Sequence, residues 1–449
     1  MKAIHSRGIG FRSMQKTSAG DRLIIFGRYP VPGKTKTRLI PALGRAGAAN
    51  LQRRLTEKTF LTAKNFTAKN NITIECCFEG GTKKKVRRWL GPIPHISFQH
   101  EGNLGQRMCS ALFSTCRAGN KRVVLVGTDI PGLSTKIFKE AFDALLKHDI
   151  VLGPSTDGGY WLIGLKRPID LFQNIDWSTP RVLKQTLTQA RLMGLAVYLL
   201  EFLSDVDTLE DLGKWRLEES APEIFLTVVI PAFNEEDHIH RSILGATDRD
   251  VEVVVADGGS TDRTVSQAES LDARVIHCPL DRARQQNFGT TVAKGENLLF
   301  LHADTLLPEG YVTQVFETLM APGTVLGAFR FKTDFCHPLM RVVEWVTHLR
   351  SRYLRLPYGD QAIFMKKSVF ERVGGFPMVP IGEDLLLVRH LIKHENARVF
   401  LATGAAITSG RRWKTYGPLK TTWMNQLMLA GMAMGISPQT LSRLYRRSS

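Results

Sequence analysis

The chain has 449 residues and a hydrophobic share of 43%, which favours two globular domains and excludes a disordered protein. It contains no run of about 18 apolar residues, which excludes a transmembrane helix. The net charge of +18 favours phosphate-bearing small molecules or an anionic membrane as partners. We expect no nucleic acid, because a zinc-finger spacing, an RNA-binding aromatic signature and a long Lys/Arg block are all missing.

The first residues are basic and show no periodicity, so we predict a basic tail over residues 1–20. They also lack the apolar core of a signal peptide, which favours a cytoplasmic protein. None of the six cysteines forms a CxxC pair, so we expect reduced thiols and no zinc site.

The next region, 21–218, alternates short apolar runs with helical patterns. Such alternation predicts an α/β domain with a mostly parallel sheet covered on both faces. The predicted strands are 21–27, 72–79, 122–127, 149–154 and 160–165, and the clearest helical patterns are 48–66 and 135–148. The pattern pauses at 219–224, which we interpret as a linker.

Residues 225–412 repeat the scheme, so we predict two tandem domains of one architecture. The predicted strands are 226–231, 252–257, 273–278 and 297–304, and the helical patterns are 235–247 and 260–271. The remaining segment, 413–449, is helical, rich in Met and Trp, and basic at its end. It packs on the second domain or lies at a membrane surface.

Four polar stretches in the second half follow strands or precede a helix. In open parallel sheets ligands bind at the carboxyl ends of strands. The first two stretches can hold a nucleotide, and their candidate residues are Pro231, Asn234, Glu235, Asp257, Gly259 and Ser260. The third carries Asp304, which can hold Mg²⁺ or Mn²⁺ on a diphosphate. The fourth carries Glu383 and Asp384, and Asp384 can act as general base on an acceptor hydroxyl. Direct attack by that hydroxyl would invert the anomeric carbon of the sugar.

Each residue also has an ordinary structural interpretation. Asp257 and Asp304 could be turn residues, and Glu383 with Asp384 could form the solvated start of a helix. Their joint order along the chain favours a site.

Residues 225–412 resemble the family 2 glycosyltransferases of the GT-A fold, through TVVIPAFNEE, VVVADGGSTDRT, LLFLHADTLLP and GEDLLL. The resemblance implies a nucleotide-sugar donor, with Asp257 at the nucleotide, Asp304 at the metal and Asp384 as the base. It departs from the family at His302, because the usual metal motif is Asp-x-Asp. Further expected contacts to the phosphates or the acceptor are Arg282, Arg284, Asp360, Gln361, Arg412 and Trp413. More narrowly, this half is similar to radical-SAM/selenodomain-associated transferase 2.

The loop 26–44 of the first half supplies backbone amides and cations that can cradle phosphate, although a basic surface loop is the alternative. Its candidate residues are Arg28, Lys34 and Arg38. Asp129 and Asp207 can hold a cation for nucleotidyl transfer, and Asp157 lies where substrate could approach two glycines.

Residues 21–215 resemble radical-SAM/selenodomain-associated transferase 1, which is related to 2-phospholactate and molybdopterin guanylyltransferases. The stretches RYPVPGKTKTRL, GTDIPGL, DGGYWLIGL and DVDTLEDL carry the resemblance, while the Gly-x-Gly-x-Arg pattern of nucleotidyltransferases is missing. The first half would thus form or bind the activated donor, and the second would transfer its sugar to an unknown hydroxyl acceptor that could be lipid-like. In one alternative the first half is a regulatory or dimerisation module; in another the basic surface itself binds a membrane or nucleic acid.

Overall fold

The computed structural model describes residues 20–219, 224–248, 251–321, 323–394, 398–434 and 436–448. The predicted tail, apart from its last residue, and most of the predicted linker at 219–224 lie outside these ranges. By packing, the chain divides into two compact units. The described part of the first comprises residues up to Gly27, Thr56–Gly80 and Ile93–Asp205, and the second comprises Arg28–Leu55, Gly81–Pro92 and Val206 onward.

The first sheet has seven strands in the order β3-β2-β1-β4-β6-β5-β7. The strands are β1 (Asp21–Arg28), β2 (Ile72–Glu79), β3 (His95–Phe98), β4 (Val123–Gly127), β5 (Ile150–Pro154), β6 (Tyr160–Leu165) and β7 (Val197–Leu199). Strand β1 pairs with β4 in parallel, whereas β6 runs antiparallel to both of its neighbours. The sheet is therefore mixed, with its apolar runs buried as predicted.

The helices of this part of the chain are η1 (Thr37–Leu39), α1 (Ile40–Thr67), α2 (Lys83–Leu90), α3 (Leu104–Arg117), α4 (Thr135–Lys147), α5 (Val182–Leu192) and α6 (Leu209–Glu219). Helices α2, α3 and α4 begin at a polar cap residue whose side chain accepts a backbone hydrogen bond. In α4, Ser134 accepts a hydrogen bond from the backbone N–H of Ile137, and the buried residues recur every three or four positions. The predicted helical patterns at 48–66 and 135–148 therefore form helices.

The second sheet has eight strands in the order β10-β9-β8-β11-β14-β13-β15-β12. The strands are β8 (Ile224–Ala232), β9 (Val251–Asp257), β10 (Arg274–His277), β11 (Gly295–Phe300), β12 (Thr305–Leu306), β13 (Thr324–Thr333), β14 (Phe364–Lys366) and β15 (Arg398–Thr408). Strands β9, β8 and β11 are parallel neighbours, while β14 is antiparallel to β11. The carboxyl ends of these three parallel strands consequently meet at one edge.

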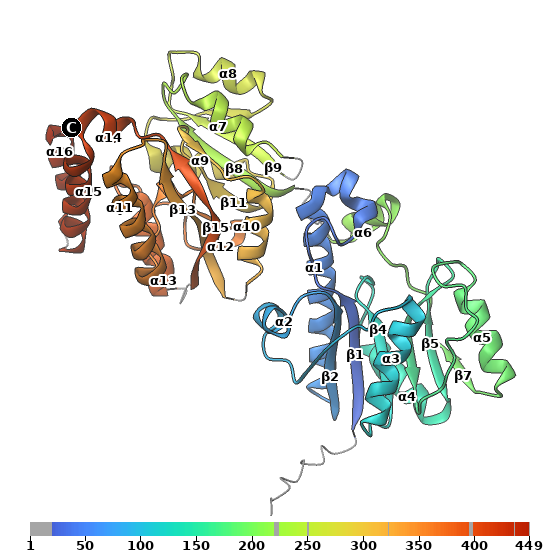
Figure 1. Ribbon diagram of the computed structural model, residues 1–449. Helices are drawn as coiled ribbons and strands as arrows, with labels where there is room; N and C mark the ends of the chain where they lie inside the picture. Colours follow the sequence, from blue (N-terminus) through green and yellow to red (C-terminus); the bar gives the residue numbers. More distant parts are fainter. Residues whose placement is uncertain are drawn as a thin grey trace, which may run out of the picture. The chain divides into compact units, whose positions relative to one another are not determined.

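Helices cover both faces of the second sheet (Figure 1). They are α7 (Ile239–Ala246), α8 (Thr264–Ser270), α9 (Arg282–Thr291), α10 (Tyr311–Leu319), α11 (Pro338–Leu349), η2 (Arg350–Leu354), η3 (Gly359–Gln361), α12 (Lys367–Arg372), α13 (Glu383–His394), α14 (Arg411–Tyr416), α15 (Pro418–Ala433) and α16 (Pro438–Ser448). Along β8, Val228 and Ile230 pack with α7, α8 and α10, whereas Val229 packs with α9, α12 and α13. Burial on both sides explains the continuous apolar run of this strand.

The predicted α/β class and the helical C-terminal segment are confirmed. One predicted strand is shorter than expected, because β11 ends at Phe300 and Asp304 lies just before β12. Within the described ranges, every helix is too short or too polar to cross a membrane.

Candidate active site

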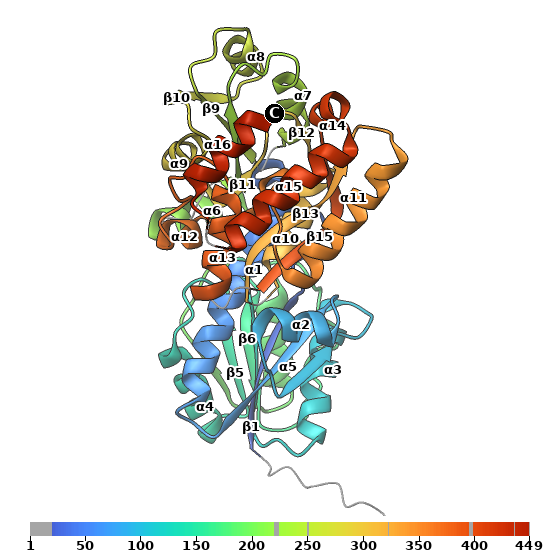
Figure 2. The ribbon, with the colours of Figure 1, turned by 90° about the vertical axis from the view of Figure 1, so that its left-hand side faces the viewer.

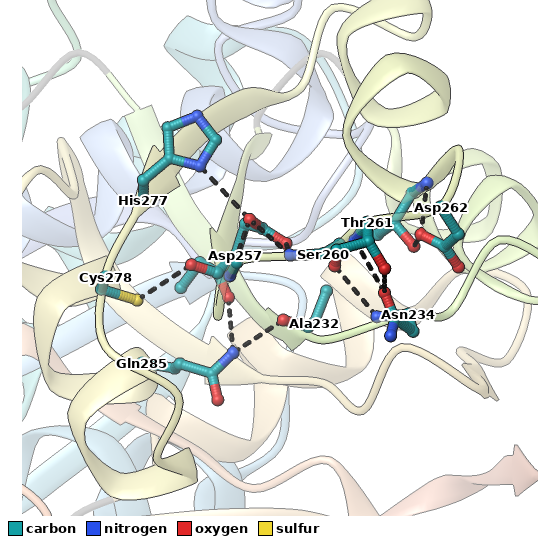
Figure 3. A network of polar contacts seen from close by, with 12 residues as sticks. Ala232, Asn234, Asp257, Ser260, Thr261, Asp262, His277, Cys278 and Gln285 are labelled. Atoms are coloured by element: carbon teal, nitrogen blue, oxygen red, sulfur yellow. Dashed lines mark hydrogen bonds and ion pairs between the residues drawn. The ribbon is translucent and has the colours of Figure 1, made fainter.

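The loops after β8 and β9 are joined by a hydrogen-bond network around Asp257 (Figure 3). The buried Asp257 carboxylate accepts hydrogen bonds from the backbone N–H groups of Gly259 and Ser260, and His277 Nδ1 lies 3.2 Å from it. Burial alone would raise the pKa of Asp257, but these hydrogen bonds lower it below its ordinary value. Asp257 is thus an ionised loop organiser, and its contact with a nucleotide stays a prediction.

Asn234 connects the loop after β8 to the loop after β9 by hydrogen bonds. Its backbone N–H donates to Ser260 Oγ at 2.9 Å, and its side-chain Oδ1 accepts from the N–H of Thr261 at 2.9 Å. Asn234 has a φ of 51°, a left-handed conformation that asparagine tolerates. Pro231, inside β8, is half-buried and leads into this loop. These predicted nucleotide residues therefore meet at one edge of the sheet.

Arg411 joins the loop after β8 to Asp304. Its guanidinium donates to both Glu235 carboxylate oxygens, at 3.0 and 2.7 Å, and lies 3.5 Å from Asp304 Oδ2. The pKa of Arg411 is raised by its hydrogen bonds to Glu235. Sequence reasoning proposed Arg412 and missed Arg411, although both belong to the same Arg-Arg-Trp stretch.

A second group of acidic residues surrounds the start of α13. The backbone N–H of Gly359 donates to Asp384 Oδ2 at 2.5 Å, which places η3 beside the predicted base. Arg282 Nε lies 3.9 Å from the buried Glu383. Burial raises the pKa of Glu383 to about 7, and the Asp384 carboxylate adds to that rise.

Two buried polar atoms beside this group have no hydrogen-bond partner, namely Asp360 Oδ1 and His302 Nε2. Burial raises the pKa of Asp360 to about 6 and lowers the pKa of His302 to about 3, so the imidazole is neutral. A Cβ on Gly359 would lie 2.9 Å from His302 Nε2 and 3.1 Å from Asp384 Oδ2. Unsatisfied buried groups of this kind are costly, and a bound hydroxyl ligand would satisfy them.

The remaining predicted residues of this unit have varied positions. Gln361 is buried, donates to the Phe329 carbonyl and accepts from Ser351, which gives it a structural role. Trp413 is buried against Phe331, and Arg412 and Arg284 are exposed. Arg282 lies 3.9 Å from Glu383, whereas the exposed Arg284 forms no ion pair with the described residues.

The surroundings of Asp304 show whether this site could hold the predicted divalent cation. Asp304 is largely buried and accepts weak contacts from the Thr305 and Thr408 hydroxyls, at 3.4 and 3.5 Å. No cluster of three or more His, Cys, Asp or Glu side chains suited to a metal occurs in the described part of the chain. Asp304 fits Mg²⁺ or Mn²⁺ as a single carboxylate, provided that phosphate oxygens supply further ligands.

The candidate residues of the first half are dispersed along their loops. Arg28, Lys34, Arg38 and Asp157 are exposed, and Asp157 Oδ1 accepts from the N–H of Gly159 in a local turn. Asp207 pairs with the buried Lys36 ammonium at 2.7 Å, and Thr128 Oγ1 lies 3.5 Å from Asp129. The metal roles of Asp129 and Asp207 stay predictions. Lys36 is a partner that the sequence does not single out among its basic neighbours.

Both halves are α/β domains, each built on a mixed sheet with helices. Residues 227–379 match the profile of glycosyl transferase family 2. Residues 62–179 match DUF2064, which is described as an uncharacterized protein conserved in bacteria. The chain thus joins a DUF2064 domain to a domain of glycosyl transferase family 2, and its narrower assignment to the selenodomain-associated groups stays a prediction.

Relatives match parts of the chain. An uncharacterized glycosyltransferase of Rickettsia bellii is 40% identical over 84 residues, which are 18% of this chain and 29% of that relative. A candidate nucleotide-diphospho-sugar transferase from Desulfovibrio desulfuricans G20 is 32% identical, with a TM-score of 0.41 over 45% of this chain and 88% of that one. Glucosyl-3-phosphoglycerate synthase from Mycobacterium tuberculosis, solved with Mn²⁺ and UDP, is 20% identical, with a TM-score of 0.34 over 50% of this chain and 83% of that one.

Proposed function

We propose that the second half is an inverting glycosyltransferase that moves a sugar from a nucleoside diphosphate to a hydroxyl acceptor. The observation that carries the proposal is the gathering of Glu235, Asp304 and Arg411 beside the parallel strand ends, next to the group around Asp384. The match to glycosyl transferase family 2 supports it.

Each side chain has a role in this mechanism. Asp384, oriented by the Gly359 N–H, removes the proton from the acceptor hydroxyl as its oxygen attacks the anomeric carbon. The bond from that carbon to the diphosphate breaks, so the attack inverts the anomeric centre. Arg411 stabilises the negative charge of the leaving diphosphate, and Asp304 would hold Mg²⁺ or Mn²⁺, which supplies further charge stabilisation when bound.

The acceptor side would be formed by His302, Asp360 and Glu383. Their unsatisfied or protonated polar atoms suit hydrogen bonds to hydroxyl groups. We propose that the acceptor is lipid-like and that the enzyme acts at the inner face of the membrane.

The deciding experiment is calorimetric titration of UDP and GDP, with and without Mn²⁺, into the wild-type protein and Asp304→Ala. Binding of one diphosphate that is strengthened by the metal, with loss of that strengthening in the variant, supports the proposal. Absence of binding to the wild type under all conditions contradicts it.

For the first half we propose that it forms or binds the activated donor, by nucleotidyl transfer from a nucleoside triphosphate to a sugar phosphate. The supporting features are the exposed cations of the loop after β1 and the acidic residue after β4. Pyrophosphate release from a triphosphate and a sugar phosphate, lost in Asp129→Ala, tests it. In the second candidate function, only the glycosyltransferase half is active, and Asp129→Ala leaves all activity intact.

A further inference from the structure

Helices α11 and α15 each leave a stripe of large apolar side chains exposed. The two helices lie side by side, as both views show (Figures 1 and 2). The exposed residues are Leu339, Val342, Trp345, Val346, Leu419, Trp423 and Leu427. Trp345 is 61% exposed and Trp423 is 65% exposed, although tryptophan is usually well buried. Single exposed apolar residues are ordinary, but a concentration on two packed helices marks an interaction surface.

The turn after α11 adds a second apolar feature with flanking cations. Tyr353 and Leu354, in η2, are 70% and 65% exposed, and the exposed Arg352 and Arg355 bracket them in the sequence. Apolar and aromatic side chains next to arginines suit the boundary between lipid headgroups and acyl chains, where aromatic rings have one apolar and one polar side.

The charge of these elements indicates which partner fits. Segments 338–355 and 411–443 contain nine basic residues and one acidic residue, Glu344. The nine are Arg341, Arg350, Arg352, Arg355, Arg411, Arg412, Lys414, Lys420 and Arg443. Arg411 and Lys414 have acidic partners, whereas Arg341, Lys420 and Arg443 are exposed and form no ion pair with the described residues. A strongly basic surface is complementary to anionic lipid headgroups.

We propose that the face formed by α11, η2 and α15 docks on the surface of an anionic lipid bilayer. Since none of the described helices is suited to spanning, the contact is interfacial, with Trp345, Tyr353 and Trp423 at headgroup depth. We call this set of elements the lipid face.

The lipid face shares elements with the acceptor side of the proposed active site. A Cβ on Gly382, the residue before Glu383, would collide with Met432 Cε of α15. At the other end, Arg350 of η2 donates to Gln361 Oε1 at 3.3 Å, next to Asp360. A consequence, which rests on the proposed function, is that the acceptor hydroxyl is carried by an amphiphile embedded in the docked membrane.

The test is co-sedimentation of the full chain with phosphatidylcholine vesicles, with or without an equal part of phosphatidylglycerol. We expect the wild type to sediment with the anionic vesicles and to remain soluble with the neutral ones. The double variant Trp345→Ser/Trp423→Ser should bind roughly tenfold more weakly, through lost apolar insertion. Arg352→Gln/Arg355→Gln should also bind roughly tenfold more weakly, because each cation near the surface contributes.

Matched controls separate the lipid face from general basic charge. Lys83→Gln/Lys84→Gln removes the same charge from α2, and Leu192→Ser removes a side chain that is 75% exposed on α5. Both controls should bind like the wild type, and equal loss in them would overturn the proposal. A wild type that stays soluble with anionic vesicles would also overturn it, as would a dimer that only Trp345→Ser/Trp423→Ser dissociates, because a second copy would then cover the face. Diphosphate titration of the same variants should be unchanged, so this test can fail without the proposed activity failing.

Discussion

The guanidinium of Arg411 lies 3.5 Å from the carboxylate of Asp304, while it holds Glu235 in two hydrogen bonds. A fixed cation therefore already faces the carboxylate expected to hold a metal. A donor diphosphate entering here meets Arg411 first, or draws it away from Asp304. In both cases the proposed function predicts that Arg411 contributes to diphosphate binding.

We expect Arg411→Gln to weaken binding of the preferred diphosphate by about tenfold to a hundredfold, because hydrogen bonds to charged groups are worth about 1.5–3 kcal/mol. Titration with and without Mn²⁺ measures the change, and the affinity gained from Mn²⁺ should be larger in the variant. Arg274→Gln is the control, since Arg274 lies on β10 and donates to the Val292 carbonyl. An unchanged affinity in Arg411→Gln would show that this arginine is structural.

The two carboxylates at the start of α13, Glu383 and Asp384, should differ in their effect on kcat. Asp384→Asn should lower kcat by about a hundredfold to ten-thousandfold, the usual contribution of a general base, with the donor affinity nearly unchanged. Glu383→Gln should lower kcat less, since Arg282 approaches Glu383 while the Gly359 N–H orients Asp384. A larger loss in Glu383→Gln would make Glu383 the base.

Much of the architecture follows from local patterns in the sequence. The runs at 72–79 and 160–165 form strands with the predicted bounds, because the side chains of a strand in a covered sheet are apolar on both faces. The short strands β7 and β12 carry no such signal, since pairing with a neighbour defines them. The acidic loop residues are also predictable from the sequence, because each directly follows an apolar run that is recognisable as a strand.

The partners of those residues are not predictable in this way. Arg411 and Glu235 lie 176 positions apart, and only the folded sheet brings them together. Lys36 likewise pairs with Asp207 across 171 positions, whereas the sequence predicts only a metal ligand at Asp207. Spacing identifies the residue types of a site, whereas ion pairs depend on tertiary packing.

The Lys36–Asp207 pair gives a test of the first half. Lys36 has 4% of its side chain exposed, so Asp207→Asn would remove a 2.7 Å ion pair from a buried ammonium. We expect a loss of roughly 3 kcal/mol or somewhat less in the free energy of unfolding, because Asp207 itself is partly exposed. Urea unfolding of the variant measures it, with Asp143→Asn on α4 as the exposed-pair control. Unchanged stability together with lost metal binding would instead support the predicted metal role of Asp207.

Asp257 should stabilise the loop after β9, independently of any contact with a nucleotide. Asp257→Asn keeps the size of the side chain but weakens its hydrogen bonds to Gly259 and Ser260. We expect a loss of about 1–3 kcal/mol in the free energy of unfolding, measured by urea denaturation. Asp272→Asn, at an exposed position before β10, should cost much less. An Asp257→Asn protein with full stability and reduced diphosphate affinity would show that the carboxylate contacts the nucleotide.

Because its pKa is raised in the folded protein, Glu383 should lower the free energy of unfolding as pH rises. Its pKa is raised to about 7 by burial and then by Asp384, whereas an unfolded glutamate titrates near 4.3. Between these values the unfolded chain loses a proton that the folded chain keeps, so this group lowers stability as pH rises, and the loss is complete above about pH 7. Relative to the wild type, Glu383→Gln should gain melting temperature from pH 4.5 to about pH 7 and then keep a constant advantage. The neutral His302 acts in the opposite direction between about pH 3 and pH 6.5 but is common to both proteins, so the difference isolates Glu383. Calorimetric scans across this range measure it, with the exposed Glu371→Gln as control; a pH-independent difference would mean that Glu383 is ionised in the folded protein.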